Sequence, residues 1–240
     1  MPQRLIIRHP DELPDHQAIL NGAANWDDIF AISTVIDGQW VKTAYERGLF
    51  PWYSQGQPVL WHSPEPRMVL MLDDFKTSPS LKKRLRQWAR QPNLNVTVNR
   101  DFAAVISACA DTRTDGTWIT DEIKAAYTEL HQQNLACSVE VWQDDALVAG
   151  LYGVIIGKMF FGESMFTRVT DGSKVALACW VRFLQAHGFK MIDCQQETEH
   201  LSRLGGAPIY RADFFAASRT LMQQAPIQLN NIHNLLEYYA

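Results

Sequence analysis

Five consecutive stretches in the second half of the chain alternate between strand-like and helix-like patterns. They span residues 138–142, 147–156, 159–165, 173–187 and 189–194. Turns at Gln143-Asp144-Asp145 and Gly157-Lys158 separate the first three, which predicts antiparallel strands joined by hairpins. Leu177 and Leu184 fall on one face of the fourth stretch and Gly188 follows it, so this stretch predicts a helix. Antiparallel strands, a central helix and a further strand beside them predict an α+β sheet domain.

The segments before these stretches extend the same domain. Residues 67–72 and 94–98 have the pattern of strands, and residues 80–90, 101–110 and 120–134 have that of helices. The last of these helices begins with a hydroxyl residue that makes a good N-cap. The order of elements is typical of an acetyltransferase-like (GNAT-like) mixed sheet with flanking helices. Such a fold does not by itself determine the chemistry.

The first part of the chain has a different character. It is rich in Trp, Pro and Gly, and residues 50–61 read as a turn flanked by aromatic side chains. Pro64 and Pro66 then interrupt the chain before the first predicted strand of the sheet. We therefore expect a small irregular N-terminal domain at residues 1–66 and the sheet domain at residues 67–240.

Composition places the chain among ordinary globular proteins. It has 240 residues, of which 47% are hydrophobic and 20% are charged. Its apolar stretches fall well short of the roughly 20 residues that a membrane-spanning helix needs. The N-terminus has an apolar run only at residues 5–7, too short for the h-region of about 7–15 residues in a secretory signal. We therefore expect a cytoplasmic protein.

The cysteines and the net charge exclude some kinds of site. Cys109, Cys137, Cys179 and Cys194 are widely spaced and form no C-x-x-C pair, which argues against a zinc site or a disulfide framework. Each is expected to be a small buried apolar residue. The net charge of −4 argues against a protein coated in basic charge, but a local basic patch is enough to contact a nucleic acid.

Several rare sequence strings resemble those of one protein family. They are Gly48-Leu49-Phe50-Pro51-Trp52-Tyr53-Ser54, Leu60-Trp61-His62-Ser63-Pro64-Glu65-Pro66-Arg67, Gly116-Thr117-Trp118-Ile119-Thr120, Ser138-Val139-Glu140-Val141-Trp142, Gly150-Leu151-Tyr152-Gly153, Phe161-Gly162-Glu163-Ser164-Met165-Phe166, Asp193-Cys194-Gln195, His200-Leu201 and Leu204-Gly205. In order and spacing they cover roughly residues 44–215. The chain resembles the bacterial leucyl/phenylalanyl-tRNA–protein transferase family.

This resemblance implies a reaction and its substrates. Members of the family take Leu or Phe, less well Met, from aminoacyl-tRNA and attach it to proteins that begin with Arg or Lys. The transfer marks those proteins for degradation (the N-end rule). The resemblance implies that aminoacyl-tRNA is a substrate and that no metal or organic cofactor is needed. The sequence carries no signature of a homodimer, so we expect a monomer.

The chain departs from the family pattern at four places. A usual Gly-Gly-Asp-Leu stretch is replaced by residues 30–37, and an aromatic residue usual after Trp61 is His62. A usual His is Cys137, and a usual Asn is Thr198. The N-terminal changes leave open a different acceptor, such as a small molecule or peptide in a biosynthetic pathway.

Asp193 and Gln195 are the candidate catalytic pair. They lie two residues apart at the end of a predicted strand, so both side chains leave it on one face. In the family the corresponding pair is assigned to activating the attacking amine. An amide oxygen is a poor base, so we expect Gln195 to orient the amine and Asp193 to stabilise the ammonium character that grows during attack. Alternatively, both residues only cap the strand and its loop.

Glu163 is the third catalytic candidate. It lies at the edge of an apolar strand, where a buried carboxylate needs a partner. A cationic amine or a hydroxyl of the terminal ribose would serve, and a structural salt bridge is the alternative. The resemblance places Leu151, Phe160 and Met165 in an apolar pocket for the transferred side chain; without it they would be read as core.

Two tryptophans and one basic helix are candidates for contacting tRNA. The resemblance places Trp52 and Trp118 in the site, where indole faces can stack on the terminal adenine or cover a cationic acceptor side chain. The basic residues of the helix at 80–90 are candidates for contacts to the tRNA backbone, with a solvated helix face as the alternative. They are Lys82, Lys83, Arg84, Arg86 and Arg90. Arg67 and Arg168 are weaker candidates.

Two other function classes fit parts of the pattern. An acyl-CoA-dependent acetyltransferase has the same fold, but it holds pyrophosphate with an Arg/Gln-x-x-Gly-x-Gly/Ala loop. Residues 168–173 have the wrong spacing for that loop and a single Gly. A non-catalytic protein that binds tRNA or protein N-termini would not need Asp193, Gln195 and Glu163.

Overall fold

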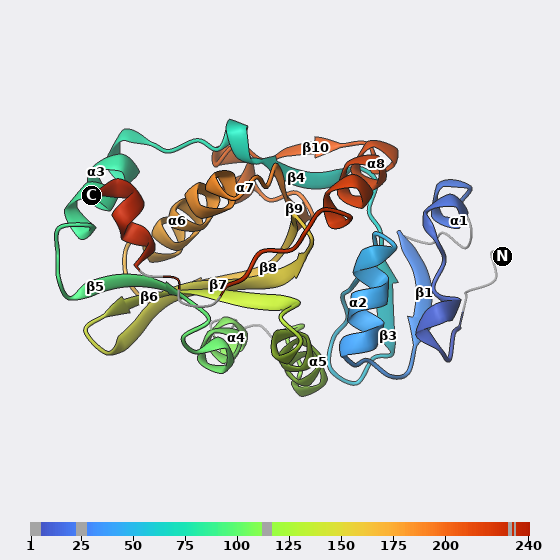
Figure 1. The fold of residues 1–240 in the computed structure, drawn as a ribbon. Coiled ribbons are helices and arrows are strands. Elements are labelled where there is room, and N and C mark those ends of the chain that lie inside the picture. The colour runs from blue at the N-terminus through green and yellow to red at the C-terminus, as the bar shows by residue number, and fades with distance from the viewer. Residues whose placement is uncertain (1–5, 23–27, 112–116, 230–231, 233) are drawn as a thin grey trace.

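The computed structural model describes residues 6–22, 28–111, 117–229, 232 and 234–240 (Figure 1). The strands of this part of the chain form two sheets. The smaller sheet has the order β1-β3-β2 and contains β1 (Ile29–Ser33), β2 (Phe50–Pro51) and β3 (Val59–His62). The larger sheet has the order β10-β4-β9-β8-β7-β6-β5. Its strands are β4 (Arg67–Met71), β5 (Leu94–Val98), β6 (Ala136–Gln143), β7 (Ala146–Ile156), β8 (Met159–Thr167), β9 (Met191–Gln195) and β10 (Ala207–Ile209).

Helices connect and cover these strands. The α-helices of the described residues are α1 (His16–Leu20), α2 (Gly38–Glu46), α3 (Pro79–Trp88), α4 (Phe102–Asp111), α5 (Asp121–Gln132), α6 (Gly172–Ala186), α7 (Glu199–Arg203) and α8 (Arg211–Met222). The short 3-10 helices are η1 (Pro10–Glu12), η2 (Leu72–Asp74) and η3 (Leu235–Tyr239).

The larger sheet separates two layers of helices. The helix α6 covers one face, and α4 and α5 cover the other (Figure 1). Along α6 the apolar side chains recur at helical spacing, and Trp180 and Leu184 are fully buried. Trp180 stacks on Phe183 with ring centroids 5.1 Å apart. Full burial of a large apolar side chain stabilises a fold by about 1.5–3 kcal/mol, so α6 contributes to holding the strands beneath it.

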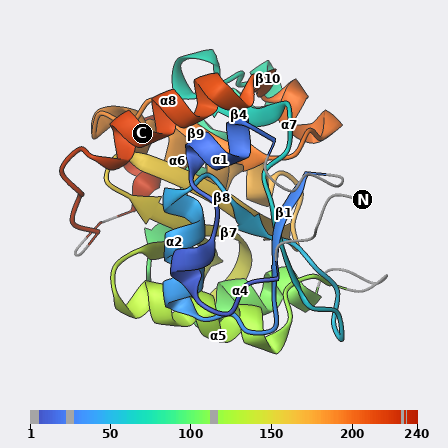
Figure 2. The ribbon, with the colours of Figure 1, turned by 90° about the vertical axis from the view of Figure 1, so that its right-hand side faces the viewer.

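The N-terminal module, which we define as β1 to β3 together with α2, lies against one end of the larger sheet between α8 and α5 (Figure 2). The helix α2 starts at Asp37, whose side chain accepts a 2.9 Å hydrogen bond from the Trp40 amide. Its buried residues Trp40 and Tyr45 belong to the same hydrophobic core as Phe161 of β8 and Phe214 of α8. The module therefore shares a core with the sheet domain.

The strands β8 and β9 open a gap in the larger sheet. They run parallel and pair through Phe160–Ile192 and Phe161–Asp193. Beyond these pairs β8 stays paired with β7 as far as Thr167, whereas β9 stays paired with β4 as far as Gln195. The two strands therefore separate at the ends that carry Glu163 and Gln195.

Most of the predicted elements are confirmed. The five stretches between residues 138 and 194 form β6, β7, β8, α6 and β9, and the earlier segments form β4, α3, β5, α4 and α5. The α+β architecture is as expected, and Thr120 caps α5 by accepting a 3.3 Å hydrogen bond from the Ile123 amide. The N-terminal part is more regular than its sequence indicated, since it contains a sheet and α2. The boundary after residue 66 stays a prediction, because the two parts share a core.

The cysteines lie largely inside the molecule. Cys109, Cys137 and Cys179 are fully buried, as expected, whereas Cys194 is partly accessible. Among the described residues, each helix is too short or too polar to cross a membrane. The apolar run at residues 5–7, which was considered as a secretory signal, begins outside the described residues.

Candidate active site

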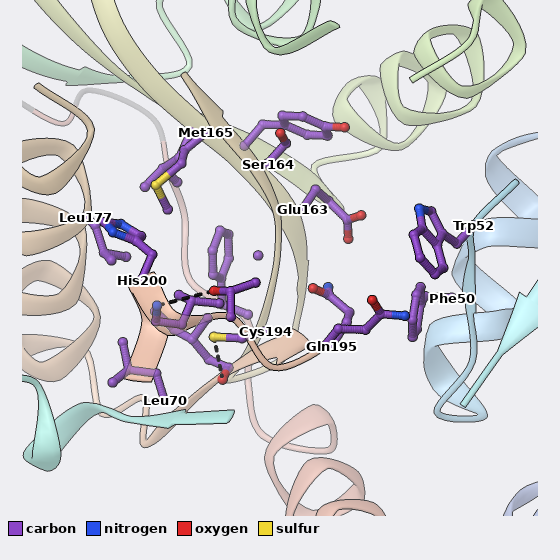
Figure 3. Close-up of a pocket in the computed structure, with 18 of the residues that line it drawn as sticks. Phe50, Trp52, Leu70, Glu163, Ser164, Met165, Leu177, Cys194, Gln195 and His200 are labelled. Atoms are coloured by element: carbon purple, nitrogen blue, oxygen red, sulfur yellow. Dashed lines mark hydrogen bonds between the residues drawn. The ribbon is translucent and has the colours of Figure 1, made fainter. Parts of the chain in front are cut away.

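A cavity of about 370 Å³ lies where β8 and β9 separate, facing the N-terminal module (Figure 3). Strands, helix ends and loops from both parts of the chain contribute to its wall. The lining residues are Phe50, Pro51, Trp52, Leu70, Trp118, Leu151, Tyr152, Phe160, Gly162, Glu163, Ser164, Met165, Leu177, Ile192, Cys194, Gln195, Gln196, Thr198, His200 and Leu201. Seven of the predicted site residues lie among them: Trp52, Trp118, Leu151, Phe160, Glu163, Met165 and Gln195.

One end of the cavity is largely apolar, although the His200 side chain lies beside Leu177 there (Figure 3). Leu151 of β7 and Phe160 and Met165 of β8 meet Leu177 of α6 there, and Met165 and Leu177 are seen on the same side in Figure 3. The Phe160 ring fits because residue 153 is a glycine: a Cβ at that position would lie 2.5 Å from the ring. A thioether and branched aliphatic groups around a ring make a wall that accepts apolar side chains of more than one shape.

Two indole rings line the cavity, and that of Trp52 lies on the side away from Met165 and Leu177 (Figure 3). Trp52 is 45% exposed although it is large and apolar, and Trp118 is partly buried. His62 supports Trp52: its Nε2 lies 3.0 Å from the Trp52 carbonyl oxygen, and the two rings meet edge to face. An exposed, braced indole offers a flat surface for a planar or cationic group.

Asp193 is not exposed to this cavity. Its carboxylate is 0% exposed and is held by the guanidinium of Arg67, with Nε 2.8 Å from Oδ1 and Nη2 2.6 Å from Oδ2. Oδ1 also accepts the backbone N–H of Gln195 at 2.9 Å. Asp193 thus pairs with Arg67 and does not line the cavity, and the chain after it has a left-handed φ of +57° at Gln195.

Gln195 is the member of the pair that reaches the cavity. Its side chain points toward the cavity in Figure 3, and within the described part of the chain its Nε2 atom is buried without a hydrogen-bond partner. An unpaired buried amide costs about 1–3 kcal/mol, a cost that a bound ligand can remove. Gln195 is thus a polar group available to a substrate.

Glu163 faces the cavity from β8 and is bound by two tyrosines. The Tyr127 hydroxyl of α5 donates to Oε2 at 3.0 Å, and the Tyr45 hydroxyl of α2 donates to Oε1. Burial raises the pKa of Glu163 to about 8, although both hydroxyl groups favour the ionised form. Among the described residues, its partners are therefore neutral hydroxyls, without an ion pair.

Comparison with known proteins shows to which family the chain belongs. The family model described as leucyl/phenylalanyl-tRNA protein transferase matches residues 69–219, and that of its N-terminal domain matches residues 36–65. A leucyl/phenylalanyl-tRNA–protein transferase of Cupriavidus metallidurans is 50% identical over 220 residues, which is 90% of this chain and 88% of that protein. The chain belongs to the leucyl/phenylalanyl-tRNA protein transferase family. It is an aminoacyltransferase.

Other relatives agree with the leucyl/phenylalanyl-tRNA protein transferase family. A protein of the same name from Methylibium petroleiphilum is 49% identical over 220 residues, 90% of this chain and 83% of that protein. A GCN5-related N-acetyltransferase from Kribbella flavida has a TM-score of 0.32 and 14% identity, over 70% of this chain and 59% of that chain. That likeness is too slight to carry an argument about function.

The departures from the family pattern have local structural roles. Residues 30–37 form β1 and the turn into α2, outside the cavity lining. His62 braces Trp52, and Cys137 is fully buried in β6. Thr198 lines the cavity and caps α7 by accepting the Leu201 amide at 3.3 Å. These leucyl/phenylalanyl-tRNA protein transferase positions thus tolerate the changes without loss of the cavity.

Four of the basic residues predicted to contact tRNA lie on α3, which packs beside α6 at the end of the sheet opposite the N-terminal module (Figure 1), and Arg90 follows just after this helix ends at Trp88. Leu81, Leu85 and Trp88 are buried, which leaves the charged side chains facing outward. Lys82, Lys83, Arg86 and Arg90 are exposed, and Arg84 is partly exposed with its Nε 3.8 Å from Asp171. These residues are not part of the cavity wall.

The two weaker candidates for tRNA contact differ in exposure. Arg67 is fully buried, so the prediction that it contacts tRNA is wrong. Arg168 is exposed and donates a 3.0 Å hydrogen bond to the Leu147 carbonyl. Gly116, in the string that contains Trp118, lies outside the described residues.

Sequence reasoning missed several residues of this candidate site. Arg67, Tyr45 and Tyr127 hold the polar groups in place, and His200 and Phe50 line the cavity. Phe50 and His200 lie in sequence strings shared with the family, and this could have indicated that they line the site. The two tyrosines carried no signal, since each is one apolar-face residue of a helix.

Proposed function

We propose that this protein transfers Leu or Phe, and less well Met, from aminoacyl-tRNA to the α-amino group of proteins that begin with Arg or Lys. The transfer marks these proteins for degradation in the cytoplasm. One observation carries the proposal: a single cavity combines an apolar pocket, two indole rings, the unpaired amide of Gln195 and the carboxyl of Glu163. These groups match the parts of an aminoacyl-adenosine that meets an amine.

The apolar end of the cavity is proposed to hold the transferred side chain. Leu151, Phe160 and Met165 surround a space that suits Leu, Phe and Met, whereas smaller side chains leave part of it unfilled. Each methylene that a substrate side chain lacks weakens its binding in this pocket by about 1–3 kcal/mol. The braced indole of Trp52 and that of Trp118 are proposed to stack on the terminal adenine, where each contact contributes about 1–3 kcal/mol.

The chemistry is aminolysis of an activated ester. The neutral acceptor nitrogen forms a bond to the ester carbonyl carbon, and the bond from that carbon to the ribose oxygen breaks. The ribose oxygen leaves as a hydroxyl with the proton that the attacking nitrogen loses. The ester is already activated, so the protein needs to supply proximity and a neutral amine, and we propose no metal or organic cofactor. Gln195 is proposed to orient the amine through its side-chain amide, the role already expected for it.

Glu163 is proposed to take the proton from the acceptor. An α-ammonium group has a pKa of about 8, and burial raises the pKa of Glu163 to about 8 as well. Proton transfer between groups of equal pKa is close to isoenergetic, which suits a general base. The positive charges of an N-terminal Arg or Lys favour ionised Glu163, which supports these residues as acceptors.

The charged side chains of α3 and of Arg90, just beyond its end, are proposed to bind the tRNA backbone. Lys82, Lys83, Arg86 and Arg90 are exposed, and they form a surface that can neutralise phosphates without reading sequence. Together with Arg84 they would give affinity that depends on salt concentration. We propose that the protein acts as a monomer on tRNA and acceptor.

A transfer assay tests the proposal. Leucyl-tRNA or phenylalanyl-tRNA with a labelled amino acid is incubated with the protein and with peptides that begin with Arg, Lys or Asp. We expect label on the Arg and Lys peptides and none on the Asp peptide. Label that stays on tRNA with every peptide contradicts the proposed acceptor. Retained binding of charged tRNA would then point to a small-molecule or peptide acceptor of another kind.

A further inference from the structure

Arg67 is a buried cation that does not contact the cavity. It begins β4, its side chain is 0% exposed, and its two hydrogen bonds to Asp193 form a bidentate pair. Withdrawing an arginine and a carboxylate from water costs several kcal/mol, and replacing such a pair by apolar residues is often neutral or stabilising. Stability alone is therefore a weak reason for this pair.

Three other elements hold the guanidinium in place. The ring of Phe50 in β2 lies 4.8 Å from the Arg67 Cζ atom, and the ring of Phe214 in α8 lies 4.6 Å from it. Nη1 also donates a 3.3 Å hydrogen bond to the carbonyl of Gly48. A guanidinium between two aromatic faces is fixed in orientation as well as in position. Arg67 therefore depends on the docking of the N-terminal module and of α8.

On its other side the pair sets the backbone of Gln195. The Asp193 Oδ1 atom accepts a hydrogen bond from Arg67 Nε. The same atom accepts a hydrogen bond from the Gln195 backbone N–H at 2.9 Å. Gln195 has a φ of +57°, a left-handed conformation that is uncommon for a residue with a Cβ. Such conformations persist where the surroundings over-determine them, often at functional sites. Two hydrogen bonds hold this one: that from the Gln195 N–H to Asp193, and a 2.7 Å bond from the Gln196 N–H to the Cys194 carbonyl, which closes the turn around Gln195.

We propose that Arg67 is a positioning residue for the transfer reaction. It fixes the Asp193 carboxylate, the carboxylate fixes the left-handed backbone of Gln195, and that backbone aims the Gln195 amide into the cavity (Figure 3). This inference rests on the proposed function only where it gives Gln195 a role in orienting the amine. Because misplacement of a reacting group by about 1 Å can cost roughly 10²-fold in rate, a small change at Arg67 is expected to lower kcat.

The substitution Arg67→Lys tests the proposal. Lysine keeps the charge but cannot bind both carboxylate oxygens through a planar fork. Arg211→Lys is the matched control: Arg211 is 7% exposed, its Nη2 lies 2.7 Å from Asp28 Oδ1, and its ring contact is Phe30, none of which lines the cavity. Transfer kinetics, thermal unfolding and hydrogen exchange of the Gln195 backbone amide are measured for both variants.

We expect R67K to lower kcat by about 10- to 100-fold, with the KM for aminoacyl-tRNA changed less than about 2-fold. The Gln195 amide is expected to exchange about 10-fold faster, whereas amides of α6 keep their protection. R211K is expected to lower the unfolding temperature without changing kcat or Gln195 exchange. Unchanged Gln195 exchange in R67K, an unchanged kcat, or equal effects in R211K would each overturn the proposal.

Two further points keep the test decisive. If R67K does not fold, Phe214→Leu removes one aromatic face while keeping the ion pair, and the same acceleration of Gln195 exchange is expected. If the unmodified protein transfers no amino acid, the proposed function fails. The exchange measurement still decides whether Arg67 sets the Gln195 backbone, since it needs no substrate.

Discussion

The hydroxyl of Tyr127 donates a 3.0 Å hydrogen bond to Oε2 of Glu163. Tyr45 donates to the other carboxyl oxygen, so helices α5 and α2 together hold one acidic group of β8 inside the cavity. Burial raises the pKa of Glu163 to about 8, and the two hydroxyl groups lower it. The tyrosines therefore moderate the rise in the pKa of Glu163 that burial causes.

Replacing Tyr127 by Phe is expected to raise the pKa of Glu163 further. A hydrogen bond to a charged group contributes about 1.5–3 kcal/mol, and one pKa unit corresponds to about 1.4 kcal/mol. We therefore expect the rise of kcat/KM with pH to move upward by about one unit. The measurement is a pH profile of transfer to an Arg peptide. Tyr239→Phe is the control, because Tyr239 donates to the Ala178 carbonyl away from the cavity. Coincident profiles for Y127F and the unmodified protein would contradict this role of Tyr127.

The stability of the fold is expected to fall as the pH rises toward 8. The pKa of Glu163 is about 8 in the folded protein and 4.5 as an ordinary glutamate, so the folded state binds more protons between these values. The contribution of Glu163 is therefore complete below about pH 4.5 and is lost as the pH rises through about 8, with a slope of at most about 1.4 kcal/mol per unit. Urea unfolding at pH 5.5, 6.5 and 7.5 measures the free energy of unfolding and so gives this slope. E163Q should have a smaller slope, and an identical slope in both proteins would count against the raised pKa.

Met165→Ala is expected to change the choice of amino acid. Shortening this side chain enlarges the apolar end of the cavity, so Leu leaves space unfilled while Phe still reaches the wall. We expect kcat/KM for leucyl-tRNA to fall about 10- to 200-fold, and less for phenylalanyl-tRNA. Competition between the two charged tRNAs gives the ratio. Met71→Ala is the matched control, since Met71 is 40% exposed and outside the cavity. An unchanged ratio in M165A would place the transferred side chain elsewhere.

Removing charge from α3 is expected to weaken tRNA binding and its dependence on salt. A variant with Lys82, Lys83 and Arg86 changed to Ala loses up to three phosphate contacts. The slope of log affinity against log salt should then be shallower by about 2–3. Lys42→Ala serves as control, because Lys42 is paired with Glu46 in the N-terminal module. Equal slopes for the triple variant and the unmodified protein would mean that α3 is a solvated face.

The sheet domain could be predicted from sequence because its signals are local. Between residues 138 and 165, apolar stretches are separated by turn residues. The helix α6 has an apolar face, and Gly188 follows its end. The N-terminal module was harder to predict, because its strands are short and α2 has nine residues. The spacing of Trp40, Val41, Ala44 and Tyr45 was nevertheless a helical signal in the sequence.

The role of Asp193 could not be predicted because its partner lies far away in sequence. Arg67 and Asp193 are 126 residues apart, and Tyr45 and Glu163 are 118 apart. A motif shows that an acid is present at a strand end, but not which way the backbone turns after it. Gln195 has a left-handed conformation, and glutamine is not a residue that indicates such a conformation. Gln195 and Glu163 could be predicted because both stand in strings shared with the family.

The most direct measurement of the central claim is the single-turnover rate of transfer from leucyl-tRNA to an Arg peptide by Gln195→Ala. The account predicts a rate about 10²-fold lower than that of the unmodified protein, with unchanged affinity for leucyl-tRNA, because the amide orients the amine and does not hold the tRNA. A rate equal to that of the unmodified protein would contradict the account, since the amine would then be oriented by another group.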